Sequence, residues 1–185
     1  MNLKKGLSFV AFGFLFLLVN LNLTLNGTTV NCTPDFIGFI LFFLAFDALG
    51  SYTQGKGYLK WISLLLVILS GAQWLLKTLR PELSGFSLLN GVTALLSAVY
   101  MFLLFGILEA IAGDFNSPRE STLSVLKYVN LLVYVLLAFF SLQSGTGISL
   151  NSASSLVLML GAIGLVSAIV TLVVLFKLRN EIRRL

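Results

Sequence analysis

Six long apolar stretches, joined by short polar connections, take up most of this chain. A membrane-spanning helix needs roughly 20 mainly apolar residues. The stretches that meet this requirement are approximately 7–25, 34–52, 59–76, 86–112, 124–142 and 153–176. With 58% hydrophobic and only 10% charged residues, the chain has more apolar surface than a soluble domain of 185 residues can bury. We therefore expect an all-α, polytopic membrane protein in which residues 1–185 form a single six-helix membrane domain.

The basic residues predict how these helices are threaded through the membrane. Lys and Arg accumulate on the cytoplasmic side of short membrane loops, and placing both termini in the cytoplasm puts ten of the twelve there. The ten are Lys4, Lys5, Lys56, Lys60, Arg119, Lys127, Lys177, Arg179, Arg183 and Arg184. Only Lys77 and Arg80 fall outside. We predict a multi-pass plasma-membrane protein with cytoplasmic termini, whose contact with the lipid bilayer accounts for the net charge of +5 without a nucleic acid partner.

The tripeptide at residues 33–35 predicts the start of the second helix. Thr33 suits the N-cap, Pro34 suits the first helical position, and Asp35 places negative charge at the positive end of the helix dipole. This favours a structural role for Asp35 at the membrane surface. A role at the edge of a functional site is the alternative.

The run NLNLTLNG, followed shortly by PDFIGFIL, resembles the opening of small uncharacterised membrane proteins of low-GC Gram-positive bacteria. The matching positions in the second run are Pro34, Asp35, Phe36, Ile37 and Gly38. Phe39 stands where the family pattern has tyrosine. The resemblance extends over the first quarter of the chain. It implies a bacterial plasma-membrane protein of the six-helix type, and it implies no activity.

Ionisable residues inside apolar spans are candidates for function, because an unpaired charge in hydrocarbon is strongly unfavourable. Asp47 and Glu109 are two such carboxylates. Under the predicted threading they fall in the cytoplasmic half of the membrane together with Lys127 and Asn130, which predicts a polar cluster between the second, fourth and fifth spans. Both carboxylates also lie near the membrane boundary. There, either can reach water or pair with the lysines at positions 56 and 60, and this structural interpretation is the alternative.

Small and polar residues inside the spans indicate where helices pack. One stripe of the fourth span is predicted to pack closely on a neighbouring helix, because its residues are small: Gly91, Ala94, Ala98 and Gly106. Gln73, with Asn20 and Asn22, is a candidate for lining an outer vestibule. Hydrogen bonding between helices is the more frequent role of such side chains.

The residue types present exclude several classes of enzyme. The chain has no histidine, which removes HExxH metalloproteases, His-ligated zinc sites and Ser/His proteolysis. Its single cysteine, Cys32, cannot form a thiolate metal cluster or an internal disulfide. The glycine-rich run at 144–149 lacks the GK[ST] of a phosphate-binding loop. We therefore predict no catalytic residue, no metal site and no cofactor.

Two function classes are compatible with these features. The first is a noncatalytic integral membrane protein that acts by association, as a subunit, regulator or immunity-type protein, with a membrane protein partner or as a homo-oligomer. The second is a small-solute binding or transport protein. Six helices, a mass near 20 kDa and cytoplasmic termini resemble in outline the substrate-binding subunits of energy-coupling-factor transporters. The Ala-x-x-x-Ala pattern that docks those subunits is missing from the first helix here, and the same spacing occurs only at Ala94 and Ala98.

Overall fold

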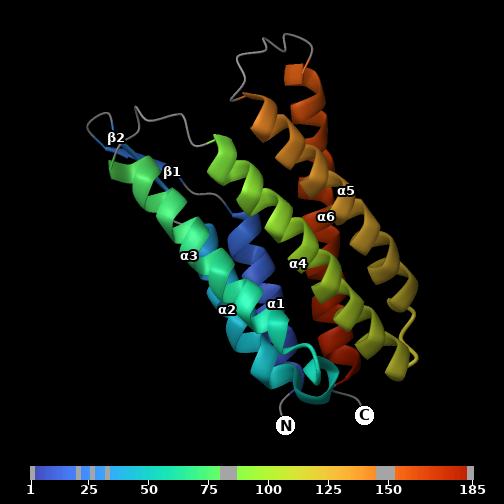
Figure 1. Ribbon diagram of the computed structural model, residues 1–185. Helices are drawn as coiled ribbons and strands as arrows, with labels where there is room; N and C mark the ends of the chain where they lie inside the picture. The colour runs from blue at the N-terminus through green and yellow to red at the C-terminus, as the bar shows by residue number, and fades with distance from the viewer. Residues whose placement is uncertain are drawn as a thin grey trace.

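The computed structural model describes residues 3–19, 22–25, 28–31, 34–79, 87–144 and 153–182. Within these residues the chain forms six α-helices, one 3-10 helix (η1) and a two-stranded hairpin (Figure 1). In chain order the elements are α1 (Leu3–Leu18), β1 (Asn22–Leu25), β2 (Thr28–Asn31), α2 (Asp35–Leu49), η1 (Gly50–Thr53), α3 (Gly57–Leu79), α4 (Ser87–Asp114), α5 (Glu120–Ser144) and α6 (Ala153–Glu181).

Five of these helices are long and apolar enough to cross a membrane, which suggests an integral membrane protein. They are α2 together with η1, and α3, α4, α5 and α6. Helix α1 has 16 residues. At about 1.5 Å per residue it is about 24 Å long, which is shorter than the roughly 30 Å of a typical hydrocarbon core.

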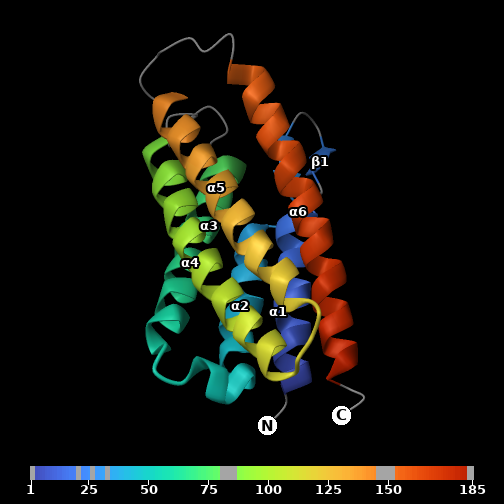
Figure 2. The same ribbon diagram turned by 90° about the vertical axis from the view of Figure 1, so that its right-hand side faces the viewer.

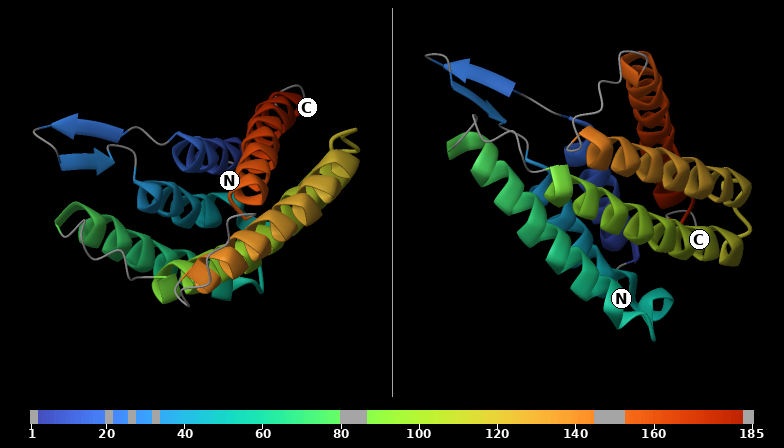
Figure 3. Two further views of the ribbon diagram at one scale, coloured as in Figure 1. Left: turned by 90° about the horizontal axis from the view of Figure 1, so that it is seen from above. Right: turned by 45° about the horizontal axis from the view of Figure 1, so that its top comes forward.

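The helices form a ring in chain order. Each packs against the next one along the chain, and α6 returns to pack against α1. Figure 3 shows this arrangement along the bundle axis, with α1 and α2 between α3 and α6. Helix α1 begins and α6 ends at the same end of the bundle, and the β1–β2 hairpin lies at the other (Figures 1 and 2). We call the corresponding parts of the bundle the termini half and the hairpin half.

The apolar core is concentrated in the termini half. There, α4 alone contributes Leu104, Phe105, Ile107, Leu108 and Ile111, each no more than 3% exposed. Aromatic rings fill the centre of the ring of helices, because Phe105 of α4 contacts Phe14 of α1 and Tyr100 of α4 contacts Phe42 of α2. Among described residues, the buried hydrophobic side chains of α6 are Leu160 in its first half and Val174, Leu175 and Leu178 in its second.

Helices α1 and α2 approach closely at a pair of glycines. A Cβ atom added at Gly38 would lie 2.8 Å from the carbonyl oxygen of Gly13, and one added at Gly13 would lie 2.5 Å from the Phe42 ring. Larger side chains cannot fit without moving the helices apart. Small residues of this kind let helix backbones pack directly on one another in membrane proteins.

The prediction that the first helix extends to residue 25 is wrong. Helix α1 ends at Leu18, and residues 22–25 form strand β1, which pairs antiparallel with β2 from Asn22↔Asn31 to Leu25↔Thr28. The reason is visible in the alternation of Asn22, Leu23, Thr24 and Leu25, which has the period of a strand rather than of a helix. The sequence between the strands is Asn-Gly, which favours two-residue hairpin loops.

The predicted start of α2 is displaced by one residue. Pro34, with φ −68° and ψ 140°, occupies the N-cap position in place of Thr33 and makes no side-chain capping hydrogen bond. Thr33 itself lies outside the described residues. Asp35 is the first helical residue, so its charge stands in the first turn as predicted. The extended backbone of Pro34 is the physical reason, since a residue with this ψ is not yet helical.

Candidate functional site

The structure does not bring the four residues of the predicted polar cluster together into one site. Lys60 of α3 donates hydrogen bonds to both carboxylate oxygens of Asp47, at 2.7 and 2.8 Å. Its ammonium group also lies 4.9 Å from the centroid of the Phe43 ring. Asp47 is therefore paired with a lysine of the neighbouring helix, as the structural interpretation of this residue predicted.

Glu109 and Lys127 do meet. The Lys127 ammonium of α5 donates to the Glu109 carboxylate of α4 at 2.9 Å and lies 5.0 Å from the centroid of the Phe102 ring. The Asn130 amide donates to the carbonyl oxygen of Leu126 in its own helix, at 2.8 Å. Within the described part of the chain, no hydrogen bond or salt bridge joins the Glu109–Lys127 pair to the Asp47–Lys60 pair.

A third ion pair fastens α6 to the turn between α4 and α5. Arg119 lies 3.4 Å from the Glu181 carboxylate, and Ser117 donates a hydrogen bond to the same carboxylate. Sequence analysis placed the basic residues around Glu181 on the cytoplasmic side and assigned no role to this acidic residue. All three ion pairs lie in the termini half, and each joins residues of different helices or turns. Their evident role is to neutralise charge while holding neighbouring helices together.

The predicted packing stripe of α4 serves more than one purpose. A Cβ atom added at Gly91 would overlap the Leu142 side chain of α5, so Gly91 packs within the chain. Ala98 is buried, whereas Ala94 lines a cavity. A Cβ at Gly106 would meet no heavy atom within 4 Å among the described residues. The stripe is therefore not one continuous contact surface.

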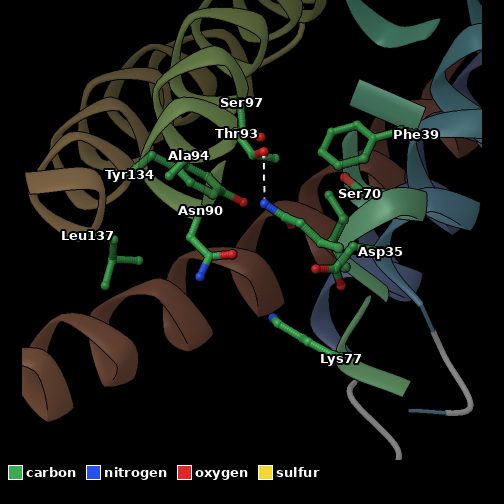
Figure 4. Close-up of a pocket in the computed structure, with 12 residues that line it drawn as sticks. Asp35, Phe39, Ser70, Lys77, Asn90, Thr93, Ala94, Ser97, Tyr134 and Leu137 are labelled. Carbon is green, nitrogen blue, oxygen red and sulfur yellow. Dashed lines mark hydrogen bonds between the residues drawn. The ribbon is translucent and has the colours of Figure 1, made fainter. Parts of the chain in front are cut away.

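A cavity of about 460 Å³ lies in the hairpin half, between α2, α3, α4 and α5. Its volume is in the range of ligand pockets, roughly 300–1,000 Å³. Helix α3 contributes Ser70, Gln73 and Lys77, whose spacing of three and four residues places them on one helix face. We call this cavity the polar pocket (Figure 4).

Helix α4 forms the opposite wall of the polar pocket in the same way. Asn90, Thr93 and Ser97 share one face and line the cavity. The Gln73 amide connects the two walls, because it donates to the Thr93 hydroxyl at 2.8 Å and to the Leu89 carbonyl oxygen at 3.2 Å. Polar side chains thus line both helices and are held in place by a direct link between them.

Two opposite charges face the polar pocket. Asp35 enters from the first turn of α2 and Lys77 from the last turns of α3, and Figure 4 shows both among the residues that line the cavity. None of the three salt bridges between described residues joins them. Both residues are exposed, so each charge remains accessible to a bound molecule.

Sequence reasoning found only part of this pocket. Gln73 was a candidate for an outer vestibule. Of its suggested companions, Asn22 lies in strand β1 and Asn20 lies outside the described residues. Lys77 carried the strongest signal, since it is one of two basic residues that break the predicted positive-inside pattern. For Asp35, the sequence favoured a helix start and left a role at the edge of a functional site as the alternative; the residue lies in the first turn of α2 and also lines the polar pocket.

The arrangement has no feature of a metal centre. Within the described ranges, no group of three or more Cys, Asp or Glu residues is placed to hold a metal ion. Comparisons with protein-family models, with curated proteins and with solved structures find no match to this chain. The function is therefore inferred from the chemistry of the polar pocket.

Proposed function

We propose that the chain is a noncatalytic, multi-pass plasma-membrane protein that binds a small zwitterionic solute in the polar pocket. The observation that carries this proposal is the presence of Asp35 and Lys77 in the wall of one cavity, without a salt bridge between these two described residues. A zwitterion offers an ammonium group to the first and an anionic group to the second. Charge-assisted hydrogen bonds of this kind are roughly twice as strong as those between neutral groups.

The proposed threading has six spans with both termini in the cytoplasm, α1 serving as a short first span. It is supported by the basic residues and by the position of the start of α1 and the end of α6 at one end of the bundle (Figure 1). This orientation directs the polar pocket to the outer side. The resemblance of the first quarter of the chain supports a bacterial plasma membrane, and the outline shared with energy-coupling-factor subunits supports solute binding.

The remaining lining of the polar pocket suits a small polar molecule. Asn90 offers both a donor and an acceptor, and Ser70 and Ser97 add buried hydroxyl groups. A few polar groups on otherwise apolar helices are typical of binding sites that fix the orientation of a ligand. No residue that lines the polar pocket is a histidine or a cysteine. The proposed function is therefore binding of the solute, without a catalytic step.

Calorimetric titration of the purified protein in detergent tests this proposal. The probes are zwitterions, namely α-amino acids and glycerophosphoethanolamine. At least one is expected to bind, and Asp35→Asn and Lys77→Met are each expected to weaken its binding about tenfold or more, because each removes a hydrogen bond to a charged group. Asp47→Asn is the matched control, since Asp47 is paired at the other end of the bundle. Unchanged binding in both pocket variants would rule the proposal out.

Association with a membrane protein partner or a second copy remains a prediction. The small residues of α4 do not strengthen it, because Gly91 packs on α5 of the same chain and Ala98 is buried. Mass spectrometry of proteins that copurify in mild detergent tests it separately.

A further inference from the structure

A second cavity adjoins the polar pocket. It has a volume of about 240 Å³ and lies between α1, α5 and α6. Most of its lining is apolar and includes Leu18, Val133, Leu160 and Leu165. Its one amide, Asn130, already donates to the Leu126 carbonyl oxygen. We call it the apolar cavity, because it offers alkyl surface with few groups for a polar ligand.

The two cavities share a wall. Leu17 of α1 and Tyr134 and Leu137 of α5 line both of them. A molecule that passes these three side chains therefore has opposite charges at one end and alkyl surface at the other. A polar pocket next to an apolar cavity matches a ligand that has both a polar and an apolar part.

The apolar cavity also lies on the lipid-facing side of the bundle. Gly161 and Leu165 of α6 line it and are exposed at the protein surface. In the proposed threading this surface is in contact with lipid chains. A Cβ atom added at Gly161 would meet no described heavy atom within 4 Å, so the glycine leaves open space beside the cavity.

We infer that the ligand is a zwitterionic amphiphile, namely a phospholipid with an ammonium headgroup. Its ammonium group contacts Asp35, its phosphate contacts Lys77, and an acyl chain passes Tyr134 into the apolar cavity. This inference rests on the proposed function, since it names the class of zwitterion that occupies the polar pocket. It adds the apolar cavity, which a water-soluble zwitterion would leave empty.

The test compares phosphatidylethanolamines of increasing acyl-chain length with glycerophosphoethanolamine, which has the same headgroup and no chains. Binding to the full chain in detergent is measured by native mass spectrometry and calorimetry. For the wild type, affinity is expected to rise with chain length, because each buried methylene group adds favourable transfer free energy. Phosphatidylglycerol, which has no ammonium group, is expected to bind at least about tenfold more weakly because it offers Asp35 no charged donor.

Gly161→Leu adds a bulky side chain in the open space beside the apolar cavity and is expected to weaken binding of the long-chain lipid about tenfold, because it competes there with the acyl carbons. Binding of glycerophosphoethanolamine is expected to stay within twofold of the wild type. Gly106→Leu is the matched control. Among the described residues its added Cβ also meets no heavy atom within 4 Å, and it lies on α4, where it lines neither cavity.

The outcomes separate the two proposals. If glycerophosphoethanolamine binds as tightly as the lipids and Gly161→Leu has no effect, the lipid inference is overturned and the proposed function stands. If lipids bind equally to the wild type, Asp35→Asn and Gly161→Leu, they are bound at the protein surface only, and the lipid inference is overturned. If no zwitterion of either kind binds, both proposals are overturned. The chain-length series on the wild type decides the inference even if Gly161→Leu does not fold.

Discussion

The two halves of the bundle differ in how several of their charged side chains are placed. In the termini half, Asp47, Glu109 and Glu181 each form a salt bridge with a Lys or Arg of a neighbouring element. In the hairpin half, Asp35 and Lys77 line a cavity, and neither takes part in the salt bridges between described residues. Paired charges leave little for a ligand to gain. Charges that line a cavity without a salt bridge between them keep that capacity, and this difference is the basis for proposing a binding site in the hairpin half.

The same contrast holds for packing. Side chains such as Leu108 and Phe105 fill the termini half at 0% exposure. In the hairpin half, Leu137 borders both cavities and is only half-buried. Native cores are packed about as densely as organic crystals. The two cavities of the hairpin half are spaces that such close packing would have filled.

The largest change in the free energy of unfolding is expected when a leucine of the filled core is replaced, and a leucine beside the cavities provides the comparison. Leu108→Ala is expected to lower the free energy of unfolding by about 2–5 kcal/mol, because it leaves a new void in a filled core. Leu137→Ala is expected to lower it by less than about 1 kcal/mol, since it only enlarges an existing cavity. Unfolding of purified protein in mixed detergents measures both values. Equal losses would contradict the difference in packing between the two halves.

The next largest effect concerns the ion pairs of the termini half. Glu109→Gln is expected to cost about 2 kcal/mol of stability, because it leaves the Lys127 charge without its partner, and the Lys127 side chain is only 15% exposed. The additional change Lys127→Met is expected to restore part of the loss. Asp47→Asn provides the comparison: Asp47 is 69% exposed, and its removal should cost no more than about 1 kcal/mol. If Asp47→Asn lost more stability than Glu109→Gln, the exposure of the side chains would not determine how strongly these ion pairs stabilise the fold.

A smaller effect is expected for the link across the polar pocket. Gln73→Leu removes the hydrogen bonds to Thr93 and Leu89 and should lower the free energy of unfolding by about 1 kcal/mol. Gln54→Leu, at an exposed position after η1, is the control and should change stability little. The same unfolding assay measures both. If Gln73→Leu left stability unchanged, the link would not hold α3 and α4 together.

The smallest effect on stability is expected for the two charges of the polar pocket. Asp35→Asn and Lys77→Met should each change the free energy of unfolding by no more than about 0.5 kcal/mol, since neither breaks a salt bridge between described residues. Binding, in contrast, should fall about tenfold. If both variants lost much stability and the double variant regained it, Asp35 and Lys77 would form a structural ion pair. Charges in the hairpin half would then be paired like those of the termini half.

Hydropathy was sufficient to locate the five helices from α2 to α6, because a long apolar run is a local property of the sequence. It failed at the end of α1. There, Asn22 to Leu25 are apolar enough on average to extend a span, but their alternation has the period of a strand. The two signals conflict over only four residues, and averaging hydropathy over a whole span hides the alternation.

The polar pocket was harder to predict because it depends on which helices are neighbours. Asp35, Gln73 and Asn90 come from three helices, and nothing local in the sequence brings them together. The ring order supplies that information. Glu109 and Lys127 were correctly expected to be near each other, since they belong to helices joined by a short turn. Depth alone groups Asp47 with them, and depth does not show which charged side chains of neighbouring helices form a pair.

The contact between α1 and α6 has a consequence for biosynthesis. Helix α6 leaves the ribosome after the five helices that precede it, so the wall that it adds to the apolar cavity is the last to be built. Phe176 then meets Phe12 of α1, and Glu181 meets Arg119. If the proposed lipid binds there, an acyl chain that already lies between α1 and α5 at that moment would be enclosed by the arriving helix. The proposed ligand would then enter the cavity during insertion into the membrane as well as by later exchange.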